Sequence, residues 1–114
     1  MSAITTHILD VSVGRPAAGV LVKLDRKTAD GQWEPIGSQE TDSDGRARDL
    51  LPDGRPLEVA LHRLTFDVGP YFSHNKVDSF YEEVAIAFVV NDSSQHYHVP
   101  LLLSPFGYST YRGS

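Results

Sequence analysis

The chain has 114 residues, of which 40% are hydrophobic and 22% charged, and its formal net charge at pH 7 is −5. This length and composition predict one soluble domain over residues 1–114 and exclude a disordered chain. The acidic balance disfavours nucleic acid as a partner, and no apolar run approaches the roughly 20 residues that span a membrane. The absence of cysteine excludes disulfides and thiolate chemistry. The first residues lack a signal-peptide pattern, so we expect a cytoplasmic protein.

Short runs of strand-forming residues alternate with turn clusters along the chain. The expected strands cover residues 5–11, 20–24, 33–41, 47–50, 57–66, 80–90, 95–103 and 108–112, and a short helical turn is expected within 69–76. In the fifth of these strands, Leu57, Val59 and Leu61 alternate with more polar or smaller residues, as in a half-buried strand. No segment has a long helical period of apolar residues. The chain is therefore expected to be all-β, an antiparallel sandwich of about seven to eight strands.

The strand expected at 95–103 carries two histidines on one face. Side chains alternate along a strand, so His96, His98, Pro100 and Leu102 share a face, and the residues between them form the core face. A sandwich of this size fills its interior, so a ligand site is expected on an outer face or between subunits. Apolar residues beside the histidines indicate that a partner covers this outer face.

His7 lies in the first expected strand, on one face with a leucine that would be exposed. Three interpretations of the histidines remain open from spacing alone. In the first, they are surface or interface residues with ordinary hydrogen bonds. In the second, the His-x-His pair and a distant histidine bind zinc. The third is general acid–base catalysis, for which imidazole is suited because its pKa lies near neutrality. His62 and His74 are expected to be structural or surface residues.

Arg46 directly follows the tight turn formed by residues 42–45. Taken alone, it is expected either to form a surface salt bridge or to bind an anionic or carbonyl-rich ligand through its guanidinium fork. The sequence has no Gly-x-Ser-x-Gly elbow, no cysteine and no glycine-rich phosphate loop. Any hydrolysis is therefore expected to use direct attack by an activated water.

Four stretches together resemble a known family. The sequences are THILD at 6–10, GRPAAGV at 14–20, TDSDGR at 41–46, and the tail from HYHVPLLLSP at 96–105 to the terminal YRGS. They resemble the transthyretin superfamily, and the tail is similar to that of its 5-hydroxyisourate hydrolase branch. The resemblance covers essentially the whole chain, and the terminal YRGS after a Ser-Pro turn is its most specific part.

The resemblance implies a transthyretin-like fold and a homotetramer, a dimer of dimers with sites at the dimer–dimer interface, where another subunit would cover Pro100 and Leu102. It implies hydrolysis of the N1–C6 cyclic amide of 5-hydroxyisourate in urate breakdown, with no cofactor and no metal. The implied catalytic residues are His7, Arg46, His98 and Ser114, and the implied substrate-binding residues are Tyr111, Arg112, Gly113 and His96. The alternative is a carrier that binds an aromatic ligand in the same channel without turnover.

Within this scheme, His98 is expected to be the general base, and His7 to hold the water or to shuttle its proton. Arg46 is expected to stabilise the charge that develops on the attacked carbonyl. Its positive charge beside the imidazoles also disfavours a divalent cation.

Overall fold

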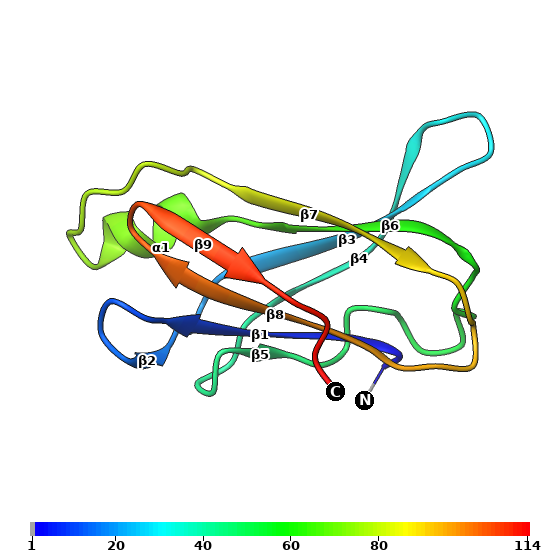
Figure 1. Cartoon of the computed structure of the whole chain (residues 1–114), viewed down its shortest axis with the longest axis horizontal. Coiled ribbons are helices and arrows are strands. Elements are labelled where there is room, and N and C mark those ends of the chain that lie inside the picture. The colour runs from blue at the N-terminus through cyan, green and yellow to red at the C-terminus, as the bar shows by residue number, and fades with distance from the viewer. Residues whose placement is uncertain (1) are drawn as a thin grey trace.

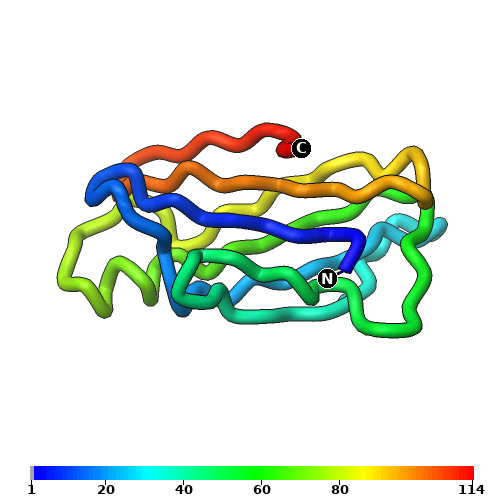
Figure 2. The backbone as a smooth tube through the Cα atoms, turned by 90° about the horizontal axis from the view of Figure 1, so that it is seen from below, coloured from blue at the N-terminus to red at the C-terminus, as the bar shows by residue number. Residues whose placement is uncertain are grey.

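Residues 2–114 are described by a computed structural model, in which two β-sheets pack face to face (Figures 1 and 2). The first sheet contains β1 (Ile4–Asp10), β2 (Arg15–Pro16), β5 (Arg46–Ala47), β8 (Tyr97–Ser104) and β9 (Gly107–Thr110). The second sheet contains β3 (Leu21–Lys27), β4 (Trp33–Glu40), β6 (Ala60–Phe66) and β7 (Val84–Val90). The helix α1 (Val68–His74) lies at one end of the sandwich, and the β3–β4 turn projects from the other (Figure 1). No helix within residues 2–114 has the length and apolar composition to cross a membrane.

The all-β sandwich with one short helix confirms the fold class expected from the sequence. Two of the strands in the described part, β2 and β5, are only two residues long, and the segment that contains β2 was expected to be a turn. The strand order is β2-β1-β8-β9, with β5 also paired to β1, and β4-β3-β6-β7. All pairs are antiparallel except β1 with β8, which run parallel. Side-chain alternation does not encode strand direction, so the sequence pattern did not predict this parallel pair.

The core lies between the two sheets and follows the expected alternation in β8. Tyr97, Val99, Leu101 and Leu103 are buried there. From β1, Ile4 and Ile8 face the same core, and Leu24, Leu64 and Phe66 meet them from the second sheet. One face of each strand is thus committed to packing, and the other remains for the surface.

The buried face of β6 differs from the expectation. Val59 is 64% exposed and precedes the strand, whereas His62 is only 2% exposed. The His62 ring is 3.1 Å from the Ala60 carbonyl oxygen through Nδ1 and lies against Phe88. Burial lowers the pKa of His62, so the ring is neutral near pH 7. A neutral imidazole with a hydrogen-bond partner is compatible with the core, which the alternation of apolar residues did not indicate.

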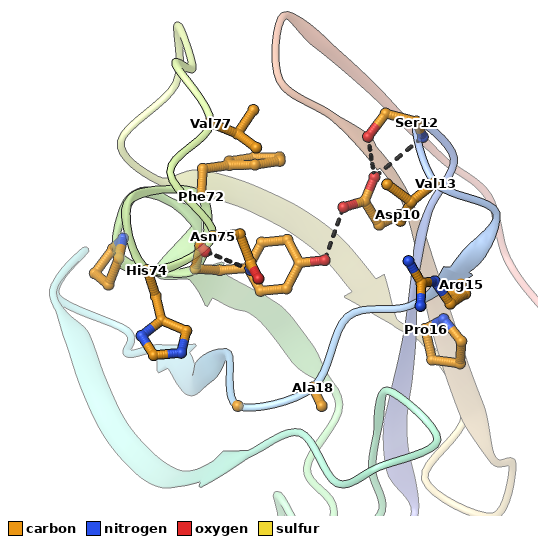
Figure 3. A pocket seen from close by; sticks show the side chains of 13 residues that line it. Asp10, Ser12, Val13, Arg15, Pro16, Ala18, Phe72, His74, Asn75 and Val77 are labelled. Carbon is orange, nitrogen blue, oxygen red and sulfur yellow. Dashed lines mark hydrogen bonds between the residues drawn. The ribbon is translucent and has the colours of Figure 1, made fainter.

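A partly buried hydrogen bond ties the helix to β1 (Figure 3). The Tyr71 hydroxyl donates to Asp10 Oδ2 at 2.7 Å, and the other oxygen of Asp10 accepts from the amide and hydroxyl of Ser12. Burial, together with the hydrogen bond to Asp10, raises the pKa of Tyr71 to about 12. The protonated phenol is therefore the form that the folded protein stabilises.

We expect Tyr71→Phe to lower the free energy of unfolding by about 1–2 kcal/mol, since it leaves the buried Asp10 carboxylate one donor short. The difference from the wild type should be constant below pH 10. It should shrink between pH 10 and about 12, because the raised pKa contributes stability only while the phenol is protonated. Urea unfolding across this pH range measures the difference, with the half-exposed Tyr108→Phe as control. An equal effect of the two substitutions would contradict the assignment.

Candidate active site

The candidate site lies on the outward face of the first sheet, where β5, β1 and β8 are adjacent (Figure 1). The register places His7 opposite Arg46 of β5 on one side and opposite Pro100 of β8 on the other. Two residues earlier, Thr5 lies opposite His98. Because side chains alternate, Thr5 and His7 share the outward face of β1.

The turn before β5 holds Arg46 in place. Asp42 Oδ1 accepts hydrogen bonds from the amides of Asp44 and Arg46, and its other oxygen accepts from Arg48 at 2.7 Å. Gly45 has a φ of +74°, and a side chain there would meet the Ile8 carbonyl oxygen at 2.6 Å. Within residues 2–114, the half-buried Arg46 side chain has no carboxylate partner, so its charge is available to a ligand.

A threonine hydroxyl joins the two histidines of the tail. Thr5 Oγ1 is 2.8 Å from His98 Nδ1 and 3.1 Å from His96 Nε2. The two rings are nearly parallel, with centroids 6.4 Å apart and an interplanar angle of 14°. His98 is half-buried, whereas His96 is exposed. Thr5 Oγ1 therefore contacts both imidazoles and holds their rings in one relative orientation.

These side chains surround a small hollow of about 190 Å³, lined by Thr5, Thr6, Arg46, Arg48, His96, His98 and Ser114. Four residues predicted from the sequence thus meet in one place. Thr5 and Arg48 were not predicted, although Thr5 shares the face of His7 by simple alternation. A larger hollow of about 720 Å³, between α1 and the β1–β2 turn (Figure 3), contains none of these side chains. Within residues 2–114, no cluster of three or more metal-ligating side chains occurs.

The end of the chain packs directly on His98. The Gly113 amide donates to the His98 carbonyl oxygen at 2.8 Å, and the Thr110 hydroxyl donates to that of Pro100 at 2.7 Å. A Cβ at Gly113 would lie 2.5 Å from His98 Cδ2 and 3.1 Å from Pro100 Cγ, so only glycine permits this approach. Pro100 is buried within the single chain, which corrects the expectation that another subunit covers it; Leu102 remains half-buried.

The other predicted site residues lie around the hollow without lining it. The Arg112 guanidinium stacks 4.4 Å from the Tyr97 ring and donates to Gln95 Oε1 at 3.0 Å. Tyr111 is exposed and, together with Arg112 and His98, lines a second hollow of about 340 Å³ beside β7. His7 is half-buried next to Arg46 in the sheet. Their roles stay predictions from the sequence.

Burial and positive charge lower the pKa values of His7 and His98. Burial lowers the pKa of His98, as does the charge of Arg46, and electrostatic interaction with His96 and His7 lowers it further. Burial, and then Arg46, lower the pKa of His7, although the Asp44 backbone and nearby carboxylates act in the opposite direction. Both rings are therefore free bases at neutral pH. A free imidazole beside an available guanidinium is suited to accept a proton while negative charge develops nearby.

Comparison with known proteins agrees with this geometry. The model of the HIUase/Transthyretin family matches residues 4–113. The chain belongs to this family. A 5-hydroxyisourate hydrolase of Caulobacter vibrioides is 47% identical over an alignment of 119 positions that covers the full length of both proteins. Another, from Salmonella dublin, is 43% identical over 97% of this chain and 80% of that protein.

Solved structures of the family include both of its branches. A Klebsiella pneumoniae 5-hydroxyisourate hydrolase matches with a TM-score of 0.82 and 36% identity, over 97% of this chain and 98% of that one. A sea bream transthyretin in complex with thyroxine matches with a TM-score of 0.91 and 32% identity, over 98% of this chain and 95% of that one. The backbone alone therefore does not separate the hydrolase branch from the carrier branch.

We expect Arg46→Gln to raise the pKa of both His7 and His98, since the positive charge of Arg46 lowers both. The acid limb of the kcat/KM profile should move to higher pH, and turnover should fall on the order of 10²-fold with the loss of a charge-stabilising donor. NMR titration of the His98 ring proton measures the pKa directly. Arg46→Lys, which retains the charge, should shift it less. An unchanged His98 pKa in Arg46→Gln would contradict the electrostatic account.

Proposed function

We propose that the chain hydrolyses the N1–C6 cyclic amide of 5-hydroxyisourate to 2-oxo-4-hydroxy-4-carboxy-5-ureidoimidazoline. The observation that carries the proposal is the meeting of His98, Arg46 and Ser114 in one hollow. Relatives over nearly the full length of the chain have the name of this enzyme. The substrate is a small electron-rich ring with several carbonyl groups, and a guanidinium beside neutral imidazoles is suited to bind and polarise such a molecule.

In this mechanism, water attacks the C6 carbonyl carbon while His98 removes its proton. The tetrahedral intermediate carries a negative oxygen, which Arg46 stabilises. The intermediate then collapses with cleavage of the C6–N1 bond, and the protonated His98 returns its proton to N1, so that the ring opens and the base is restored. His7, beside Arg46, holds the water or shuttles its proton.

The hydroxyl of Ser114 provides a further polar contact to the substrate. His96 lines the same hollow and is available at its edge. Tyr111 and Arg112 act around the opening, and Gly113 allows the tail to reach His98.

The alternative is a carrier that binds an aromatic ligand without turnover, as suggested by the likeness to a transthyretin that was solved with thyroxine. Two observations favour the hydrolase. Curated relatives named as hydrolases are 42–47% identical to this chain and the solved hydrolase is 36% identical, against 32% for that transthyretin. Binding alone also has no use for neutral imidazoles whose pKa values are kept low beside an available guanidinium.

We further propose a homotetramer, a dimer of dimers with the sites at the dimer–dimer interface. The single chain leaves large apolar side chains uncovered near its edge strands β7 and β9, including Phe80 at 72%, Val89 at 64% and Phe106 at 70% exposed. The outward face with the histidines is also open, and Leu102 is only half-buried there. Burial of such surface in subunit contacts is the usual solution. A cytoplasmic location stays a prediction from the sequence.

The direct test is to mix the purified protein with freshly generated 5-hydroxyisourate and to follow its ultraviolet absorbance against the spontaneous decay. We expect acceleration by the wild type. His98→Asn should reduce kcat by about 10²–10⁴-fold because the general base is lost. His74→Asn, which removes an exposed imidazole on α1, is the matched control and should retain full turnover.

Two outcomes of this test are decisive. If the wild type does not accelerate the decay, the chain is not this enzyme. If it does and His98→Asn retains full turnover, the enzyme assignment holds but another group is the base.

A further inference from the structure

Thr5 occupies a special position because it is the side chain that links His98 to His96. Thr5 is only 4% exposed, and its hydroxyl oxygen is 2.8 Å from His98 Nδ1 and 3.1 Å from His96 Nε2. Both distances are those of hydrogen bonds. The mechanism proposed above uses neither Thr5 nor a defined role of His96, so this contact remains to be explained.

The chemistry of the three groups restricts how they share protons. A hydroxyl has one proton to donate and can accept from others, whereas a neutral imidazole has one nitrogen that donates and one that accepts. Thr5 therefore donates to one ring and accepts from the other when both rings are neutral. Two arrangements exist, and they differ in which nitrogen of His98 carries the proton.

Only one arrangement leaves His98 competent as a base. Nδ1 is the nitrogen engaged by Thr5, so Nε2 is the one left to act on a water. If Thr5 donated to Nδ1, the proton of the neutral ring would sit on Nε2 and block it. If Nδ1 donates to Thr5 instead, Nε2 carries a free lone pair. The Thr5 hydroxyl then donates to His96 Nε2.

We infer, on the basis of the proposed function, that Thr5 is a positioning residue that fixes His98 in the Nδ1–H tautomer. His96 accepts the hydrogen bond that the Thr5 hydroxyl donates. His98 Nδ1–H donates a hydrogen bond to Thr5 Oγ1, and the Thr5 hydroxyl donates in turn to His96 Nε2. His96 thus acts through Thr5 and needs no contact with the substrate.

Two further features agree with this order. The rings of His96 and His98 are nearly parallel, so both nitrogens reach the same hydroxyl without distortion of either ring. Parallel pairing of β1 with β8 holds the three groups in register.

The primary test reads the tautomer, independently of turnover. Long-range ¹H–¹⁵N NMR correlations of His98 are recorded above the ring pKa for the wild type, Thr5→Val and Thr5→Ser. We expect Nδ1–H in the wild type, a mixture of both tautomers in Thr5→Val, and recovery of Nδ1–H in Thr5→Ser. An Nε2–H tautomer in the wild type, or one that does not respond to Thr5→Val, overturns the inference. The wild-type spectrum decides this even if Thr5→Val does not fold.

The kinetic test separates positioning from packing. Thr5→Val should lower kcat by roughly 10-fold with little change in KM, the effect of one lost hydrogen bond to the base, and Thr5→Ser should restore most of it. His96→Leu should act in the same direction, because it removes the acceptor for the Thr5 proton. Thr28→Val, which alters a hydroxyl in the distant β3–β4 turn, should change nothing. Equal losses in Thr5→Val and Thr5→Ser would contradict a role for the hydroxyl.

If the wild type showed no hydrolase activity, the proposed function would fail while the tautomer measurement still gave a clear answer. An inactive wild type with His98 in the Nδ1–H tautomer would contradict the proposed function but not the inference about Thr5.

Discussion

The parallel pairing of β1 with β8 is the constraint on which the rest of the structure depends. It runs from Ile4 opposite Tyr97 to Asp10 opposite Leu103 and joins the two ends of the chain at the centre of the first sheet. Both strands bury one face in the core, and a slip by one residue would turn His98 inward and expose its buried neighbours. Core packing and site geometry are thus set by the same register.

The tail completes the site by close backbone approach. Beyond β9, the chain continues alongside β8, and the Gly113 amide donates a hydrogen bond to the His98 carbonyl oxygen. The absence of a side chain at Gly113 allows this contact with His98, and the same segment buries Pro100. The terminal Ser114 then lines the hollow beside Arg46. The last residues therefore belong to the site and to the packing of the sheet at once.

The sequence predicted what depends on local pattern and missed what depends on strand pairing. Alternation placed His98 on the outer face, and the fold class followed from the spacing of turns. The parallel β1–β8 pair and the contact of Thr5 with both histidines arise between segments more than 90 residues apart, which no local pattern encodes. The buried side of β6 was also missed, since a neutral His62 with a carbonyl partner replaces an apolar residue there. The close approach of Gly113 to Pro100, 13 positions earlier, is likewise beyond the reach of strand periodicity.

Deletion of residues 111–114 tests whether the tail is part of the catalytic site. The shortened chain keeps β9 and its pairing with β8, so circular dichroism should report an intact sandwich. Decay of freshly generated 5-hydroxyisourate is then compared for the shortened and the full chain at equal concentration. We expect the shortened chain to fold but to lose most of its acceleration of 5-hydroxyisourate decay, because Ser114 and the segment that packs on His98 are gone. Full turnover by the shortened, folded chain would contradict it.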